Sequence, residues 1–138
     1  MSKSISSVVD AVHSAARKVA KRITQEFPAA ASPGDAVRQG DIYIALLASI
    51  PRGCKAIDKP SRQVAPGTGQ GSRHVLDRDV RQYAVKDSDE FTGPVLQCEE
   101  ITTLTHPEHG DWTLPPGLYQ ISYQRTQDAL DQQRRVQD

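Results

Sequence analysis

The residues with the greatest capacity for chemistry cluster in the segment 105–111, which is THPEHGD. It contains His106, Glu108 and His109, and imidazole and carboxylate are side chains that hold Zn²⁺ or Fe²⁺ in proteins. Two histidines three residues apart point to opposite faces of a strand, but they converge where the backbone turns between them. A proline and a glycine within the segment favour such a turn. The segment is therefore either a metal-binding turn or the polar, solvent-exposed tip of a hairpin.

A metal ion at this turn would need a third protein ligand, and His74 in the segment GSRHVLD is the obvious candidate. Barrels of the cupin type bring histidines from separate strands together at the barrel mouth, where a carboxylate completes the site. On this hypothesis the protein is a cupin-like enzyme that uses Zn or Fe to polarise a substrate oxygen or to activate water, with Glu108 as acid or base. The spacing of the histidines differs from that of the usual cupin motif. The candidate metal site consists of His74, His106, Glu108 and His109.

Two further segments could carry chemistry but favour it less. Glycines 67, 69 and 71 alternate in a loop, but neither a helix pattern nor a GKS or GKT sequence follows, so a flexible loop fits better than a phosphate cradle. Cys54 lies between Arg52 and Lys55, which favour its thiolate, but no spacing connects it to a histidine base. Cys54 and Cys98 are too far apart for a zinc ribbon; two reduced thiols are the default, and one disulfide remains open. We assign no catalytic residue.

The segment 5–27 has the pattern of an amphipathic helix that ends before Pro28. Its apolar residues follow a spacing of four and three, as in the a and d positions of a coiled coil. This face could pack on its own domain, on a copy or partner helix, or on a membrane surface through its basic residues. We expect it to carry the interaction residues Ile5, Val9, Val12, Val19 and Ile23.

The chain beyond this helix is typical of a β-domain. Residues 28–39 are rich in Pro, Ala, Ser and Gly and predict a linker, and residues 40–125 contain six to eight short apolar or alternating runs separated by Gly and Pro. Residues 126–138 form a polar C-terminal tail. The pattern predicts a mainly β fold, a small sandwich or barrel of jelly-roll-like form, with one N-terminal amphipathic α-helix outside it.

The last strands are expected to form a hairpin, with arms at 111–114 and 118–125 joined by Pro115, Pro116 and Gly117. A type II turn would need a positive φ at Gly117. The alternation in LYQISYQR places Tyr119, Ile121, Tyr123 and Arg125 on one face, which we assign to the core.

The charge distribution argues against nucleic acid as a partner. Formal net charge is zero, and aromatic residues make up 5% of the chain, too few for a stacking surface. Residues 52–81 nevertheless carry an excess of basic side chains, and residues 86–111 an excess of acidic ones. These two blocks can attract each other within one fold or between copies, or remain solvated. No apolar run approaches the length that spans a bilayer, and the N-terminus lacks a signal-peptide pattern.

Three segments resemble a group of small bacterial and phage-encoded proteins without an established activity. They are RQGDIYIALLASIP, GTGQGSRHVL and LTHPEHGDWTLPPGLYQISYQR, and the resemblance runs from about Arg38 to Asp138. The group shows a G-H-x-H pattern followed by H-x-E-H and L-P-x-G-x-Y. His74 stands at the second histidine of the first pattern, whereas Ser72 replaces the first. The resemblance implies that any metal bound by these histidines has lost one ligand here.

Together these features predict an accessory or structural module without catalytic activity, which assembles through its N-terminal helix and β-domain surface. Its partner would be a protein chain or further copies of itself, with no cofactor, and its location cytoplasmic or virion- and phage-associated. The alternative is the cupin-like metal-dependent enzyme described above.

Overall fold

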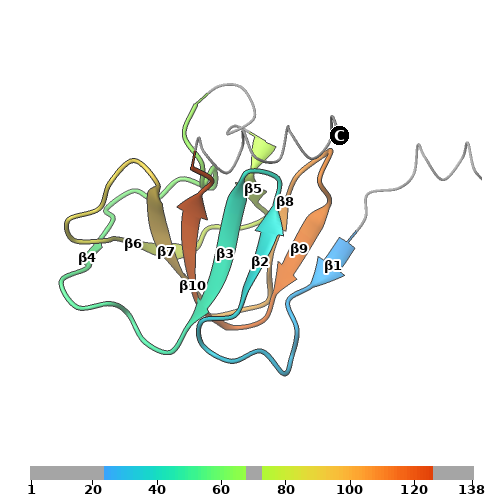
Figure 1. Cartoon of the computed structure of the whole chain (residues 1–138), viewed down its shortest axis with the longest axis horizontal. Helices are drawn as coiled ribbons and strands as arrows, with labels where there is room; N and C mark the ends of the chain where they lie inside the picture. Colours follow the sequence, from blue (N-terminus) through green and yellow to red (C-terminus); the bar gives the residue numbers. More distant parts are fainter. Residues whose placement is uncertain (1–23, 68–72, 126–138) are drawn as a thin grey trace, which may run out of the picture.

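The computed structural model describes residues 24–67 and 73–125, and these residues form a mainly β structure (Figure 1). Its strands are β1 (Thr24–Glu26), β2 (Ala36–Gln39), β3 (Ile42–Leu47), β4 (Lys55–Ala56), β5 (Val75–Leu76), β6 (Arg81–Ala84), β7 (Thr92–Cys98), β8 (Thr102–Thr105), β9 (Asp111–Leu114) and β10 (Gly117–Tyr123). The predicted β class is confirmed. Residues 5–23 of the helix predicted at 5–27, and the C-terminal tail, lie outside the described residues.

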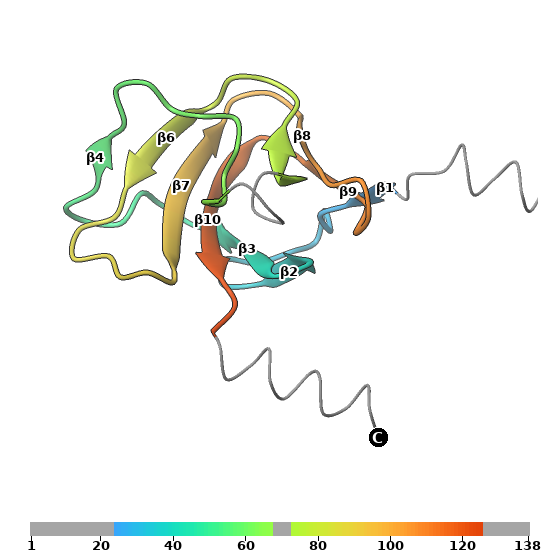
Figure 2. The same ribbon diagram turned by 90° about the horizontal axis from the view of Figure 1, so that it is seen from above.

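The strands form two sheets that do not close into a barrel (Figure 2). The six-stranded sheet has the order β2-β3-β10-β7-β6-β4, and the four-stranded sheet has the order β1-β9-β8-β5. All pairings are antiparallel except that of β1 with β9. The sheets meet where β2 passes β9, and the indole N–H of Trp112 donates to the backbone oxygen of Arg38 across this junction at 3.0 Å.

Two boundaries predicted at the N-terminal side were wrong. The last residues of the predicted helix form strand β1, and Phe27 is buried in the core with its ring 5.3 Å from that of Tyr119. The predicted linker contains β2, which pairs along its whole length with β3. The β-domain therefore begins at least sixteen residues before Gly40, since Thr24 already pairs with Asp111. Composition alone conceals these short strands because their residues are largely exposed.

The predicted hairpin at 111–125 does not form, because β9 and β10 belong to different sheets. Pro115 and Pro116 carry the chain from one sheet to the other, and the positive φ expected at Gly117 is not adopted. The predicted core face of β10 is confirmed for Tyr119 and Ile121, which are buried, and for Tyr123, which packs against the core. It was wrong for Arg125, which lies beyond the end of the strand and is exposed. The hydroxyl of Tyr119 donates to the backbone oxygen of Pro115 at 2.6 Å, which anchors this crossover.

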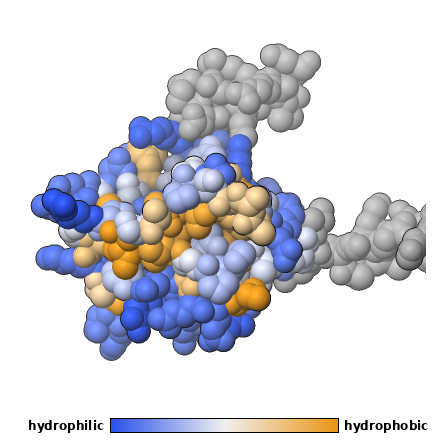
Figure 3. Space-filling model, turned by 90° about the horizontal axis from the view of Figure 1, so that it is seen from below, coloured by the Kyte–Doolittle hydropathy of each residue, from blue (hydrophilic) through white to orange (hydrophobic). Residues whose placement is uncertain are grey.

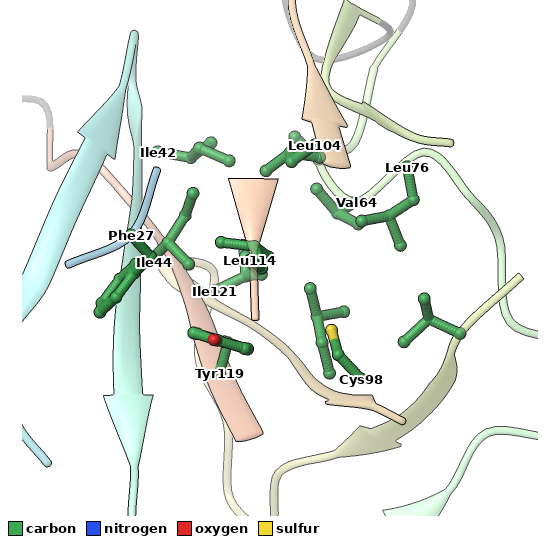
Figure 4. Close-up of a cluster of buried hydrophobic side chains, with 13 residues drawn as sticks. Phe27, Ile42, Ile44, Val64, Leu76, Cys98, Leu104, Leu114, Tyr119 and Ile121 are labelled. Carbon is green, nitrogen blue, oxygen red and sulfur yellow. The ribbon is translucent and has the colours of Figure 1, made fainter. Parts of the chain in front are cut away.

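A continuous apolar core fills the space between the sheets (Figure 4). Ile42 and Ile44 of β3 and Ile121 of β10 face Leu104 and Leu114 of the four-stranded sheet, and all five are fully buried. Each such side chain contributes about 1.5–3 kcal/mol to folding. This core fixes the relative position of the two sheets, and with it the position of the loops at their junction.

The basic and acidic blocks attract each other within the fold. Arg73 pairs with Glu108 at 2.7 Å and Arg78 with Glu100 at 3.3 Å, each joining one block to the other. These pairs are half-exposed and contribute little stability singly. Cys54 and Cys98 are both free thiols, so the disulfide left open by the sequence is not formed.

Candidate functional site at the junction of the two sheets

Polar residues from three separate segments meet where the sheets join. Gln39 ends β2, Asp41 follows it in the turn to β3, and His74 immediately precedes β5. The other two residues, His106 and His109, lie in the turn between β8 and β9. We refer to these five residues as the histidine cluster.

The three histidines lie together, as the metal alternative required. The ring centroids of His74 and His106 are 4.5 Å apart, and those of His106 and His109 are also 4.5 Å apart. The backbone turns after His106 as expected, with the N–H of Gly110 donating to the oxygen of His106 at 3.1 Å. The prediction of an exposed hairpin tip was wrong for His106, which is fully buried, whereas His109 and Glu108 are exposed.

Gly40 permits the close approach between the two turns. Its φ is +61°, and a Cβ at this position would lie 2.5 Å from Cδ2 of His109. The left-handed backbone and the missing side chain are both needed here, since an L-residue would be strained and would collide with the imidazole. The ring of His109 consequently lies on the backbone of the β2–β3 turn.

Gln39 is the fully buried centre of the cluster. Its Nε2 donates to the backbone oxygens of Leu104 and Gly110, both at 2.8 Å, while Oε1 is 2.8 Å from Nδ1 of His74. The two carbonyls accept hydrogen bonds only, so they fix which end of the amide carries its N–H groups. Gln39 thereby ties β2 to both ends of the β8–β9 turn and orients the ring of His74.

His74 is fully buried and uses both ring nitrogens. Nδ1 faces Gln39, and Nε2 lies 2.9 Å from Oδ1 of Asp41, whose side chain is 55% exposed. Burial lowers the pKa of His74, and the hydrogen bond and charge of Asp41 act in the opposite direction. The ring thus anchors a carboxylate that otherwise faces water.

His106 binds the protein backbone instead. Its Nδ1 accepts hydrogen bonds from the backbone N–H groups of Glu108 and His109, both at 3.1 Å. A neutral imidazole that accepts at Nδ1 carries its proton on Nε2. Burial, followed by the charges of His74 and His109, lowers the pKa of His106 to about 4, so the ring is neutral at pH 7. Its Nε2 is buried and has no hydrogen-bond partner among the described residues.

This hydrogen-bond pattern does not fit the predicted metal site. A metal ion binds the lone pair of an imidazole nitrogen, but that of His106 is occupied at Nδ1, and Nε2 carries the proton. Glu108 turns outward to Arg73. Within residues 24–67 and 73–125, no group of three or more His, Cys, Asp and Glu side chains is arranged to hold a metal.

Gln39 and Asp41 were not among the predicted site residues. Both are part of RQGD, a segment that otherwise looks like the start of a buried strand. A glycine followed by an aspartate just before an apolar strand is the pattern that could have identified them, because it indicates a tight turn with a polar side chain at its end.

Comparison with known protein families matches residues 38–124 to one described as a domain of unknown function, DUF8820. The match covers more than half of the chain. The chain belongs to this family. The DUF8820 match begins at Arg38, where the predicted resemblance also begins, but it ends before the C-terminal tail, which the resemblance included. It contains the entire histidine cluster and leaves out β1. Comparisons with curated proteins and with solved structures found no match.

Proposed function

We propose that this DUF8820 protein is an accessory or structural module without catalytic activity, which assembles through its N-terminal segment and its β-domain surface. The observation that carries the proposal is the use of the imidazole nitrogens. Both nitrogens of His74 and Nδ1 of His106 bind groups of the protein itself. Imidazoles engaged in this way hold the junction of the sheets together and are not free to act on a substrate.

The surface of the β-domain supports the interaction part of the proposal. Figure 3 shows apolar residues gathered across the middle of one face with hydrophilic residues around them. Such patches mark protein–protein contacts more often than ordinary surface. Elsewhere an open groove of about 700 Å³ lies between the segment before β5 and the β6–β7 turn. Its walls combine apolar residues such as Val64, Ala65 and Pro94 with the acidic Asp89 and Glu90.

The N-terminal part of the proposal rests on the sequence pattern alone, because Ile5, Val9, Val12, Val19 and Ile23 lie outside the described residues. In this pattern, charged residues at the a and d positions would destroy the apolar face. Self-assembly through this face predicts that the full-length protein sediments as a species larger than its 15.1 kDa chain.

Analytical ultracentrifugation of full-length protein tests this. The double substitution Val9→Asp with Val19→Asp should give a monomer, whereas Ser7→Asp with Ser14→Asp adds the same charge away from the apolar face and should leave the assembly intact. A monomeric wild-type protein over the micromolar range would refute self-assembly. If the serine variant also dissociated, charge rather than the apolar face would be responsible.

Within the described ranges, no helix is sufficiently long and apolar to cross a lipid bilayer. We also expect the purified protein to carry no stoichiometric zinc or iron. Metal analysis of wild-type protein beside His109→Ala checks this, and one equivalent of metal that the substitution removes would favour the cupin-like enzyme instead.

A further inference from the structure

The orientation of the Gln39 amide determines the protonation of Nδ1 of His74. Its Nε2 faces the backbone oxygens of Leu104 and Gly110 at 2.8 Å, so a flipped amide would place its oxygen against two acceptors. Oε1 therefore faces His74, and Nδ1 of His74 must donate to it across 2.8 Å.

The opposite nitrogen of the same ring faces a second acceptor. Nε2 of His74 lies 2.9 Å from Oδ1 of Asp41. A neutral ring that carries its proton on Nδ1 would direct a lone pair from Nε2 at the carboxylate. Two lone pairs at this distance repel, whereas one additional proton between them forms a charge-assisted hydrogen bond.

We propose that His74 and Asp41 share one proton at neutral pH and form a pH-sensitive clasp between the two sheets. The proton resides either on the imidazole, as an imidazolium–carboxylate pair, or on the carboxyl group, as a neutral pair. The number of protons is one in both cases, and the two groups titrate as a unit.

The surroundings act on the proton of this pair in both directions: burial lowers the pKa of His74, whereas the hydrogen bond and the charge of Asp41 raise it. From the β8–β9 turn, His106 and His109 face the ring of His74, and a charge on either opposes a charge on His74. His106 is held neutral by its backbone hydrogen bonds. Among the charged groups nearby, Arg73 and Glu108 are paired with each other at 2.7 Å, and the carboxylate of Asp111 accepts from the backbone N–H of His106 at 3.1 Å.

The clasp has a structural consequence because of what each partner connects. Asp41 belongs to the β2–β3 turn of the six-stranded sheet, whereas His74 leads into β5 of the four-stranded sheet. Loss of the shared proton at alkaline pH turns their contact into repulsion, and the exposed carboxylate of Asp41 can then move into water. The junction would loosen at the β2–β3 turn, against which the ring of His109 packs.

Nuclear magnetic resonance of the full-length protein tests the inference directly. Ring ¹⁵N shifts of His74 and the carboxyl ¹³C shift of Asp41 report the two sites separately. At pH 7 we expect Nδ1 protonated and one further proton on Nε2 or on the carboxyl group. On raising the pH, both signals should change in one common transition as that proton leaves.

Asp41→Asn is the decisive variant. The asparagine amide can donate to the lone pair of a neutral His74, so the hydrogen bond survives without the additional proton. The alkaline transition of His74 should disappear in Asp41→Asn. The fall in melting temperature that we expect for the wild type at alkaline pH should be smaller in this variant. Asp58→Asn, at an exposed aspartate after β4, is the matched control and should retain the wild-type transition.

Two outcomes would overturn the inference. One is a wild-type spectrum at pH 7 in which Nε2 of His74 is unprotonated while Asp41 is ionised. The other is an alkaline transition of His74 that persists unchanged in Asp41→Asn. The wild-type spectrum decides the question by itself if the variant does not fold, and neither result depends on the oligomeric state tested above.

Discussion

Acid should destabilise this fold through His106. In the folded protein Nδ1 of His106 accepts from two backbone N–H groups, so a proton at Nδ1 would remove both hydrogen bonds and set N–H against N–H. In the unfolded chain the same ring binds a proton freely. The pKa of His106 falls from 6.5 to about 4 on folding, chiefly because the ring is buried.

The sign and size of the effect follow from this difference. A group whose pKa is depressed in the folded state contributes stability that is present above its unfolded pKa and lost as the pH falls toward its folded pKa. The window therefore runs from 6.5 down to about 4. Each pH unit within it corresponds to about 1.4 kcal/mol, which gives a total loss of about 3 kcal/mol. Such a loss is a large fraction of the stability of an ordinary domain, about 5–15 kcal/mol.

Urea unfolding followed by the fluorescence of Trp112, the single tryptophan, measures this. His106→Asn is the matched variant, because its Oδ1 can take the place of Nδ1 as acceptor but does not titrate. The free energy of unfolding of the wild type should fall by about 2 kcal/mol more than that of His106→Asn between about pH 7.5 and about pH 5. Groups that do not contact His106 contribute equally to both proteins and cancel in the comparison, whereas the charge coupling of His106 with His74 and His109 is part of the measured difference. Parallel pH dependence in the two proteins would refute the role assigned to Nδ1.

Three further predictions concern the neighbours of His106 and the thiols. Gly40→Ala should lower the free energy of unfolding by more than about 1 kcal/mol in urea titrations, because it adds a Cβ at φ +61° and 2.5 Å from the ring of His109; a neutral effect would show that the ring moves without cost. Gln39→Leu removes three buried hydrogen bonds, to one imidazole nitrogen and two backbone oxygens, and the same titration should show a loss of about 3 kcal/mol or more. In native protein a thiol reagent should modify Cys54 rapidly and Cys98 only on unfolding, since Cys98 is buried and its pKa is raised to about 11; the variant Cys54→Ser should then show no fast phase.

Patterns along the chain predict the core of this protein well. The alternation in β10 identifies Tyr119 and Ile121 as interior residues, and both are buried. Burial alternates with the side chains of a strand, so a pattern with a period of two identifies the inner face without knowledge of the fold. The same pattern does not say which sheet a strand joins, and for that reason β9 and β10 looked like one hairpin.

The composition of the histidine cluster could be predicted only in part. The turn expected after His106 allowed His106 and His109 to converge, His74 was a candidate third member, and the ring separations place all three together. Gln39 and Asp41 were missed because their role depends on a pairing between distant segments, 65 residues apart for Gln39 and Leu104. The residue types in a short segment show which side chains can bind a ligand, whereas the fold decides which groups of the protein lie close enough to bind them.

The hydrogen-bond partners of the two adjacent imidazoles favour opposite protonation states. His74 lies between two acceptors, which favour protons on both of its nitrogens. His106, with its ring centroid 4.5 Å away, accepts from two donors and is stable only without a proton on Nδ1. A positive charge on one ring also opposes a charge on the other, so each arrangement reinforces its neighbour. The cluster should therefore lose its structure by different routes at the two ends of the pH scale, through His106 in acid and through the pair of His74 and Asp41 in alkali.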